Sequence, residues 1–525
     1  MYIYVPLSIC LIWAQSLCIS AQKILQHDFN KALVSQDRAL SKRAPHALGA
    51  TIDHQSYIYT VNVTIGHPGQ NVQMQIVTGS TDTYMFSPTA PLCLQSSDCP
   101  SAIFNPSQST SYASTTVPFN LTYIGGWNAH GGYFIDNVQI GGVTIEKVQM
   151  GLAYNATAGS PNYAQLGLGW PDQESICTSD TCATYPTFLD DLVTQGIIAS
   201  RTFSIWLNNT DSPTGTILFG GVDNTKYQEP LTSFPMQQDG SGNFSDYSLI
   251  VESVYLISVA TGQPESLASV ANNPTKYSIE VDSTFTIFAP TAWAVLVKTL
   301  ALQNFSTSSW WTPCNTSDAL IAFQLGPSNG PLYTTFLEDS IQPGVTKTVN
   351  GTAYCAVTMD SSDNSGGVAV LGEVFLRHLY AVYDLDSKTI SLAASNSSAT
   401  GSNFVEIPAG GGGVPGVNST VGSPTTTSSL AATTTSNQSA TPVIACGSFA
   451  TSSFTQTRFD GYVTQTVDRC PGVISTLGLS NPSASPSAAF TSTPATKGNA
   501  STLSVTNSVL LLLTSITVGF VRYFG

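Results

Sequence analysis

A carboxylate at the end of an apolar strand is the first candidate for chemistry in this chain. The segment Ile279-Glu280-Val281-Asp282-Ser283-Thr284-Phe285 runs from an apolar strand into a turn rich in hydroxyl side chains. A carboxylate such as Asp282 can take up or release a proton, as general acid–base catalysis requires. Much earlier, Gln75-Ile76-Val77-Thr78-Gly79-Ser80-Thr81 has the same form with valine at the corresponding position. One copy of the pattern therefore offers a carboxylate, and the other offers an isopropyl group.

The surroundings of these two segments recur as well. Val77 is followed by Leu166-Gly167-Leu168-Gly169, and Asp282 is followed by Leu371-Gly372-Glu373. The two offsets agree, because 166 − 77 and 371 − 282 are both 89. A shared spacing of this length indicates an internal duplication.

From about residue 55 to 395 the chain resembles the pepsin-like aspartic peptidases. That family carries a hydrophobic-hydrophobic-Asp-Thr/Ser-Gly motif in each of two lobes. Further stretches that carry the resemblance are Asn62 to Gln70, Ile217 to Asp223, and Phe375-Leu376-Arg377, with Glu373 in place of the usual aspartate. The resemblance implies an all-β, two-lobed, mostly antiparallel fold with a cleft between the lobes. Within fungi the chain is most similar to the cell-surface, lipid-anchored branch.

The resemblance also assigns the site residues. Asp282 matches the second-lobe catalytic aspartate, and Val77 occupies the place of the first. The family's chemistry needs two carboxylates that share one proton and hold a water. Thr78 and Ser283 keep the hydroxyls that brace the two loops, and we expect both at a substrate-binding site. Thr284 replaces the motif glycine, whose bare backbone normally lets the loop turn sharply.

Tyr123 is expected to complete the substrate-binding set. It matches a tyrosine that lies over the family's cleft on a hairpin flap, although the family's usual residues around that tyrosine are absent. An ordinary half-buried strand tyrosine is the alternative. Asp82 lies five residues after Val77, where relatives already carry a non-catalytic aspartate, so it should not substitute.

Three functions follow from these residues. The first is a catalytically impaired family member that binds extended peptides by strand addition. The second is an active acid endopeptidase, with another carboxylate entering the site or a weakly active first motif. The third is a cell-wall structural glycoprotein without a ligand.

Composition limits the partners. The chain has 525 residues, of which 17 are Lys or Arg and 32 are Asp or Glu, giving a formal net charge of −15 at pH 7. Such scarcity of basic residues argues against nucleic acid as a partner. No CxxC or His-rich cluster occurs in the sequence, so no metal is expected. We expect no cofactor, and a monomer.

The two ends of the chain indicate the secretory pathway. Residues 1–21 have the pattern of a signal peptide, with a buried core helix as the alternative. Residues 22–43 end in Lys42-Arg43 and resemble a propeptide, with a charged linker as the alternative. Residues 400–500 are rich in Ser and Thr, as expected of a glycosylated stalk. Residues 501–525, after Gly498-Asn499-Ala500, match a glycosylphosphatidylinositol attachment signal, and a tilted transmembrane anchor is the alternative.

Cysteines and glycosylation sequons fit the same compartment. Numerous Asn-x-Ser/Thr sequons, Asn62 and Asn120 among them, fit a glycosylated surface. Eight cysteines outside the signal segment indicate disulfides, whose connectivity does not follow from the sequence. Short local loops are the simplest pairing: Cys93 with Cys99, Cys177 with Cys182, Cys314 with Cys355, and Cys446 with Cys470.

Between the ends, strand patterns dominate. We assign residues 50–230 to an N-terminal β lobe and residues 231–396 to a C-terminal β lobe. Helical spacing occurs at residues 187–193 and at residues 290–302, the second with proline at its start. The segment 443–470 has two cysteines and several aromatic residues, which suits a small disulfide loop.

Overall fold

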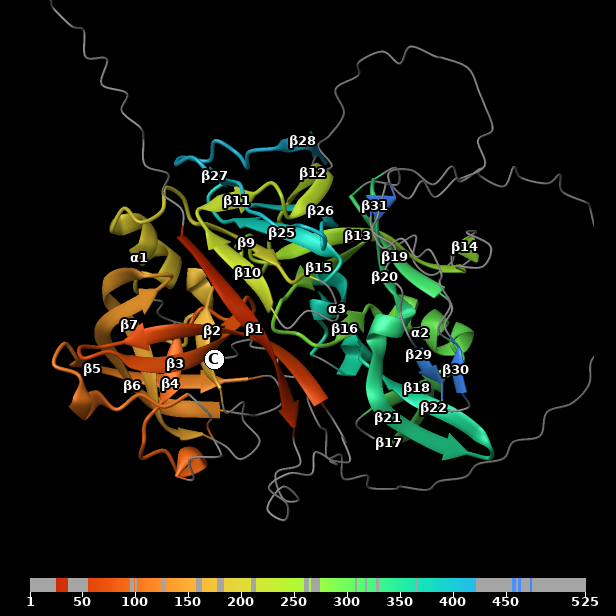
Figure 1. Ribbon diagram of the computed structural model, residues 1–525, viewed down its shortest axis with the longest axis horizontal. Helices are drawn as coiled ribbons and strands as arrows, with labels where there is room; N and C mark the ends of the chain where they lie inside the picture. Colours follow the sequence, from red (N-terminus) through yellow and green to blue (C-terminus); the bar gives the residue numbers. More distant parts are fainter. Residues whose placement is uncertain are drawn as a thin grey trace, which may run out of the picture.

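The computed structural model describes residues 25–35 and 55–421, with three short strands between residues 456 and 474. Inside 55–421 it leaves out residues 95–98, 100–101, 124–127, 157–162, 177–183, 209–213, 259–263, 266–273, 307–308, 317–318, 327–329 and 365. The described chain consists mainly of strands, with three short α-helices (Figure 1). The predicted all-β class is confirmed.

The first lobe is drawn in red to orange in Figure 1 and begins with consecutive strands. They are β2 (Gln55–Ile65), β3 (Gln70–Val77), β4 (Tyr84–Phe86), β5 (Ala113–Thr122), β6 (Asn128–Ile140), β7 (Val143–Ala156) and β8 (Ala164–Gly167). Two glycines, Gly141 and Gly142, join β6 to β7, with φ of 57° and 80°. This two-residue turn requires positive φ at both positions, which explains glycine there.

A central set of strands continues the same sheet. It contains β1 (Leu25–Ser35), β9 (Thr202–Trp206), β10 (Thr214–Phe219), β12 (Tyr227–Pro235), β25 (Leu379–Asp384), β26 (Thr389–Ser395) and β28 (Val417–Thr420). Strand β1, from the predicted propeptide, pairs antiparallel with β10 on one side and β2 on the other. The fourteen-stranded sheet therefore joins both halves of the chain.

The second lobe has two sheets of its own. The nine-stranded sheet contains β13 (Ser248–Ser258), β14 (Pro264–Glu265), β15 (Thr275–Ile279), β16 (Thr286–Phe288), β19 (Ala319–Leu325), β20 (Leu332–Phe336), β23 (Met359–Ser361), β24 (Ala369–Leu371) and β31 (Val473–Ile474). The four-stranded sheet contains β17 (Gln303–Ser306), β18 (Ser309–Pro313), β21 (Ile341–Val349) and β22 (Thr352–Val357). Two separate strand pairs complete the list: β11 (Gly221–Asp223) with β27 (Phe404–Glu406), and β29 (Gln456–Arg458) with β30 (Gly461–Val463).

The duplication predicted from spacing is visible in the strand order. The first lobe runs β3-β8-β4-β7, and the second runs β15-β24-β16-β23. In both runs the three successive pairings are parallel, antiparallel and parallel. A Cβ at Gly167 would lie 2.2 Å from the Thr81 carbonyl oxygen, and one at Gly372 would lie 2.3 Å from that of Ser283. In each lobe a glycine therefore packs directly against the loop of the repeated motif. That loop follows Val77 in the first lobe and contains Asp282 in the second.

Both predicted helices are present at the expected places. Helix α1 (Phe188–Thr194) begins with a reciprocal capping box between Thr187 and Asp190. Helix α2 (Pro290–Thr299) has proline in its first turn. It ends before residue 302 because Ala301 adopts a left-handed conformation with φ of 49°. The third helix, α3 (Glu373–Leu376), is a single turn after β24.

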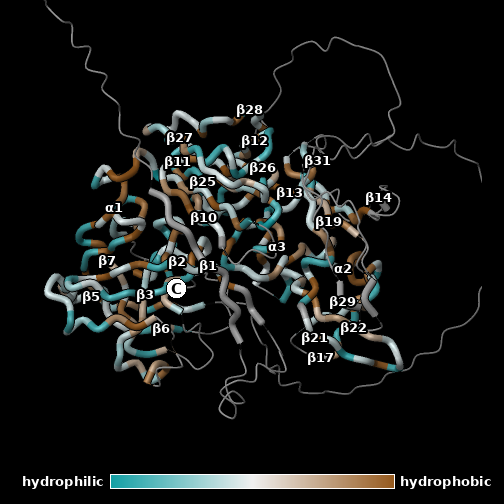
Figure 2. The backbone as a smooth tube through the Cα atoms, viewed as in Figure 1, coloured by the Kyte–Doolittle hydropathy of each residue, from teal (hydrophilic) through white to brown (hydrophobic). Residues whose placement is uncertain are grey.

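Burial follows the alternation of the strands. Figure 2 shows hydrophobic and hydrophilic residues alternating along the strands of both lobes. In β3, the buried Val72, Met74 and Ile76 share one face. One continuous apolar core contains residues of both lobes, from Tyr59 to Leu392.

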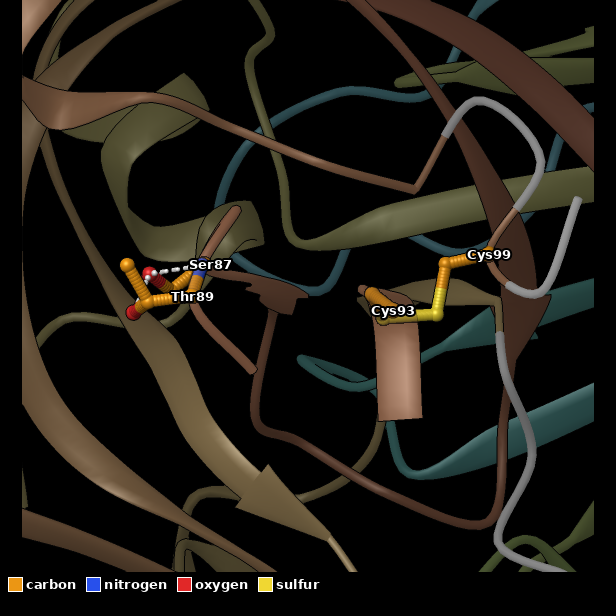
Figure 3. The surroundings of a disulfide bond; sticks show 4 residues. All are labelled: Ser87, Thr89, Cys93 and Cys99. Atoms are coloured by element: carbon orange, nitrogen blue, oxygen red, sulfur yellow. Dashed lines mark hydrogen bonds between the residues drawn. A yellow bond between two sulfur atoms is a disulfide. The ribbon is translucent and has the colours of Figure 1, made fainter. Parts of the chain in front are cut away.

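Two of the four suggested disulfides fall on described residues, and both are present. Cys93 is bonded to Cys99 (Figure 3), and Cys314 is bonded to Cys355.

The other two suggested disulfides lie outside the described residues and stay predictions. One would join Cys177 to Cys182, and the other would join Cys446 to Cys470. The predicted signal peptide, Lys42-Arg43 and the predicted attachment signal also lie outside the described residues.

The predicted start of the stalk needs a correction. Strand β27 pairs with β11, and β28 pairs in parallel with β12. The residues that we assigned to the stalk from 400 therefore include strands up to Thr420. The composition predicted the boundary too early. The glycine-rich turns at 410–413 lie between short strands that still pair with strands of the two-lobed fold.

Candidate active site at the junction of the lobes

The two halves of the repeated pattern meet between the lobes. Val77 ends β3, is buried, and accepts a hydrogen bond at its carbonyl oxygen from the Leu168 amide at 2.8 Å. Asp282 lies in the turn after β15 and is partly exposed. Thr78 and Gly79, which follow Val77, contact the Asp282 carboxylate directly. The structure thus brings the loop after Val77 into contact with the aspartate of the second copy.

Three donors from the first lobe bind one oxygen of Asp282. Its Oδ1 accepts from the Thr78 amide at 2.8 Å, the Thr78 hydroxyl at 3.1 Å and the Gly79 amide at 3.3 Å. Hydrogen bonds to an ionised carboxylate favour the charged form. Burial nevertheless raises the pKa of Asp282 above its ordinary value, outweighing these bonds. The site therefore favours a protonated carboxyl more than open water does.

Of the two predicted bracing hydroxyls, Thr78 spans the lobes. Its Oγ1 donates to Asp282 and accepts from the Val281 amide at 3.0 Å. Ser283 Oγ instead donates to the Phe285 carbonyl oxygen within its own lobe, at 2.9 Å. Thr284 is not among the residues with positive φ, so this loop accepts threonine at the glycine position without left-handed backbone.

Asp82 is held away from the site. Its carboxylate accepts hydrogen bonds from the Tyr133 hydroxyl at 2.6 Å, the Tyr185 hydroxyl at 2.8 Å and the Ser175 amide at 2.7 Å. The side chain is completely buried. These contacts agree with the expectation that Asp82 does not replace a carboxylate at position 77.

Tyr123 follows β5 at the turn of the β5–β6 hairpin, where a flap was predicted. Its ring is buried, its hydroxyl shares a 2.7 Å hydrogen bond with the Tyr84 hydroxyl, and it donates to Gln165 Oε1 at 3.0 Å. In this structure the side chain is thus anchored in the first lobe. Its role in substrate binding stays a prediction.

Comparison with known proteins assigns the family. The family model described as "Eukaryotic aspartyl protease" matches residues 58–395. The chain belongs to the eukaryotic aspartyl protease family. The match covers both lobes and both copies of the repeated pattern.

Individual relatives agree. The chain is 30% identical to the protein named "Probable aspartic-type endopeptidase opsB" from Aspergillus fumigatus, covering 78% of this chain and 84% of that protein. It is 27% identical to barrierpepsin from Saccharomyces cerevisiae, over 70% of this chain and 65% of that one. The aspartic proteinase from Irpex lacteus has the same fold, with a TM-score of 0.51 at 20% identity, covering 66% of this chain and 96% of that one.

Sequence reasoning about this family member did not single out Glu280. A Cβ at Gly79 would lie 3.4 Å from Asp282 Oδ2 and 3.5 Å from Glu280 Oε2. Both carboxylates therefore face the same point. The distance between Asp282 Oδ2 and Glu280 Oε2 cannot exceed the sum of 3.4 Å and 3.5 Å. Glu280 is only 7% exposed. The available signal was the spacing, since a second acid stands two residues before Asp282, just after the same strand.

Neither a metal site nor a membrane-spanning helix is found in the described part of the chain. Its residues contain no group of three or more His, Cys, Asp or Glu side chains placed to hold a metal ion. No helix among them is both long and apolar enough to cross a bilayer.

Proposed function

We propose that this chain is a secreted, surface-anchored aspartyl protease relative that binds extended peptides at Asp282 and hydrolyses them far more slowly than a two-aspartate enzyme. The predicted signal peptide and lipid-attachment signal support its placement at the cell surface. Membership of an endopeptidase family supports an extended peptide as the ligand.

One observation carries the proposal. Asp282 reaches across to the first lobe and binds the amides of Thr78 and Gly79, while the residue before them is a buried valine. The isopropyl group of Val77 cannot share a proton or polarise a water. Losing one member of a catalytic unit commonly lowers the rate by several powers of ten.

The β5–β6 hairpin supports peptide binding. Strand β5 is the last strand of the fourteen-stranded sheet, so one of its edges has no partner strand among the described residues. An exposed sheet edge can bind an extended peptide through backbone hydrogen bonds. Such binding does not require a second aspartate.

The test measures binding and cleavage in the same sample. The purified full chain is mixed with fluorescent peptides from an unfolded protein across acidic pH, and anisotropy and mass spectrometry follow binding and cleavage. We expect saturable binding with little cleavage, and weaker binding by Asp282→Asn. No binding at any pH would contradict the proposal, as would rapid cleavage that Asp282→Asn abolishes.

A further inference from the structure

Position 280 places a second acid beside the one remaining motif aspartate. All three first-lobe donors go to Asp282 Oδ1, and Oδ2 is the oxygen that faces the point shared with Glu280 Oε2. The backbone of Glu280 is fixed just after β15, because its amide donates to the Leu371 carbonyl oxygen at 3.1 Å.

The described elements around Glu280 and Asp282 present a loop whose side chains do not titrate in acid, an ion pair and a neutral phenol. The first-lobe loop facing it consists of Thr78, Gly79 and Ser80, none of which titrates in the acidic range. Beyond β24, Glu373 is paired with Arg377 at 2.6 Å. On β25, burial together with the charges of Asp282 and Glu280 raises the pKa of Tyr383, so its phenol stays neutral.

We propose that Glu280 is the second carboxylate of this site, sharing one proton with Asp282 and holding with it the water that attacks a bound peptide. Two carboxylates that face one point repel each other when both are ionised, so the pair keeps one proton more readily in mild acid than two separate acids would. This inference rests on the proposed function, because it concerns the same peptide site. It supplies a route for the slow hydrolysis proposed there.

The reaction balances with these two groups alone. The ionised carboxylate takes a proton from the water as its oxygen bonds to the peptide carbonyl carbon. The protonated carboxyl gives its proton to the carbonyl oxygen, forming a neutral tetrahedral intermediate. The C–N bond then breaks, and the proton taken from water passes to the leaving nitrogen while the other returns to the pair. One water and one amide give one acid and one amine.

Gly79 provides the space for this water. A methyl group there would be 3.4 to 3.5 Å from both carboxylates, which is ordinary van der Waals contact. Its φ is not in the left-handed region, so alanine is compatible with the backbone. Gly79→Ala should therefore fold normally and displace the water without removing either acid.

The first experiment measures the pH dependence of binding. The ligand is a peptide with a secondary alcohol in place of one amide carbonyl, and titration calorimetry compares the full chain with Glu280→Gln and Gly79→Ala. For the natural chain we expect a binding maximum in mild acid. Glu280→Gln should move the upper limb of that maximum toward lower pH by about one unit or more, a tenfold change at fixed pH. Gly79→Ala should weaken binding without moving the limb.

Glu146→Gln is the matched control, because Glu146 is an exposed acid on β7 and belongs to neither of the two loops that meet at the site. It should leave the profile unchanged. Identical profiles for Glu280→Gln and the natural chain would overturn the inference. Absence of binding by the natural chain would overturn the proposed function instead.

A second measurement decides the inference even without peptide binding. Carbon-13 NMR titration of labelled carboxyl groups gives the pKa of Asp282, assigned with Asp282→Asn. Removing the neighbouring acid in Glu280→Gln should lower the pKa of Asp282. An unchanged pKa would show that the two carboxyls do not share a proton.

Discussion

At the scale of single residues, the loop after Val77 connects the two lobes although position 77 carries no carboxylate. The Thr78 hydroxyl serves both the Val281 amide and the Asp282 carboxylate. Val77 fills its own position with apolar volume and is 1% exposed. The loop still folds against the second lobe, so the scaffold does not depend on a carboxylate at position 77.

Thr78→Val tests this connection. Valine has nearly the same shape, but the buried Val281 amide would lose its acceptor. An unsatisfied buried donor costs about 1–3 kcal/mol of unfolding free energy. Urea unfolding of the variant should show that loss, whereas Thr144→Val, at an exposed position of β7, should show little. Equal effects of the two substitutions would mean that Thr78 does not link the lobes.

The residue scale also shows where sequence reasoning stopped. The motif spacing predicted a duplication, and the resemblance to the pepsin-like family placed Val77 and Asp282 in equivalent loops near the lobe interface. Glu280 was overlooked because it stands at a position that the motif describes only as hydrophobic. Its place two residues before Asp282 is visible in the sequence, but the sequence does not show that both carboxylates face Gly79 of the other lobe.

At the scale of elements, helix α3 carries a buried ion pair under the second-lobe loop. Arg377 Nη2 lies 2.6 Å from Glu373 Oε1, and the two side chains are 6% and 1% exposed. The Glu373 amide donates to the Ser283 carbonyl oxygen at 2.7 Å, next to Asp282. The ion pair therefore supports the turn that carries the aspartate.

Arg377→Met should destabilise the protein strongly. It leaves Glu373 buried without its cation, and breaking a buried pair in this way costs about 3–5 kcal/mol. The double variant that combines Glu373→Leu with Arg377→Met should regain much of that loss. Arg201→Met removes partly exposed pairs with Asp386 and Asp190 and should cost about 1 kcal/mol. Thermal or urea unfolding gives all three values, and an Arg377→Met loss as small as that of Arg201→Met would contradict this account.

Element boundaries were predicted less well than element types. Helix α2 begins at Pro290 as expected but ends early, because Ala301 turns into left-handed backbone. Strands β27 and β28 were hidden in a stretch whose composition is typical of a stalk. Their place depends on partners nearly two hundred residues earlier in the chain, β11 and β12. Local composition does not predict such long-range strand pairings.

At the scale of the whole molecule, several buried acids make the fold suited to acidic conditions. Burial raises the pKa of Glu174 from 4.5 to about 9, and burial with the charge of Asp190 raises that of Asp191 from 3.8 to about 7. Both groups bind their protons more tightly in the folded state. Their stabilising effect is thus fully present below the unfolded pKa values and is lost as pH rises toward the folded ones.

Unfolding free energy should therefore fall between about pH 5 and pH 8. Glu174→Gln keeps the shape but does not ionise, so the variant should lose less stability than the natural chain over that range. Glu146→Gln, on the exposed surface, should keep the natural slope. Chemical unfolding at a series of pH values measures these slopes, and a natural chain whose stability rises toward neutral pH would contradict the assignment.

The central proposal is that this family member is slow because position 77 carries valine in place of a carboxylate. The most direct test compares kcat/KM for one peptide in acid among the natural chain, Val77→Asp and the size-matched Val77→Asn. We predict a gain of about a thousandfold in Val77→Asp, abolished by adding Asp282→Asn, and no gain in Val77→Asn. A natural chain as fast as Val77→Asp would contradict the account, as would a correctly folded Val77→Asp with no gain.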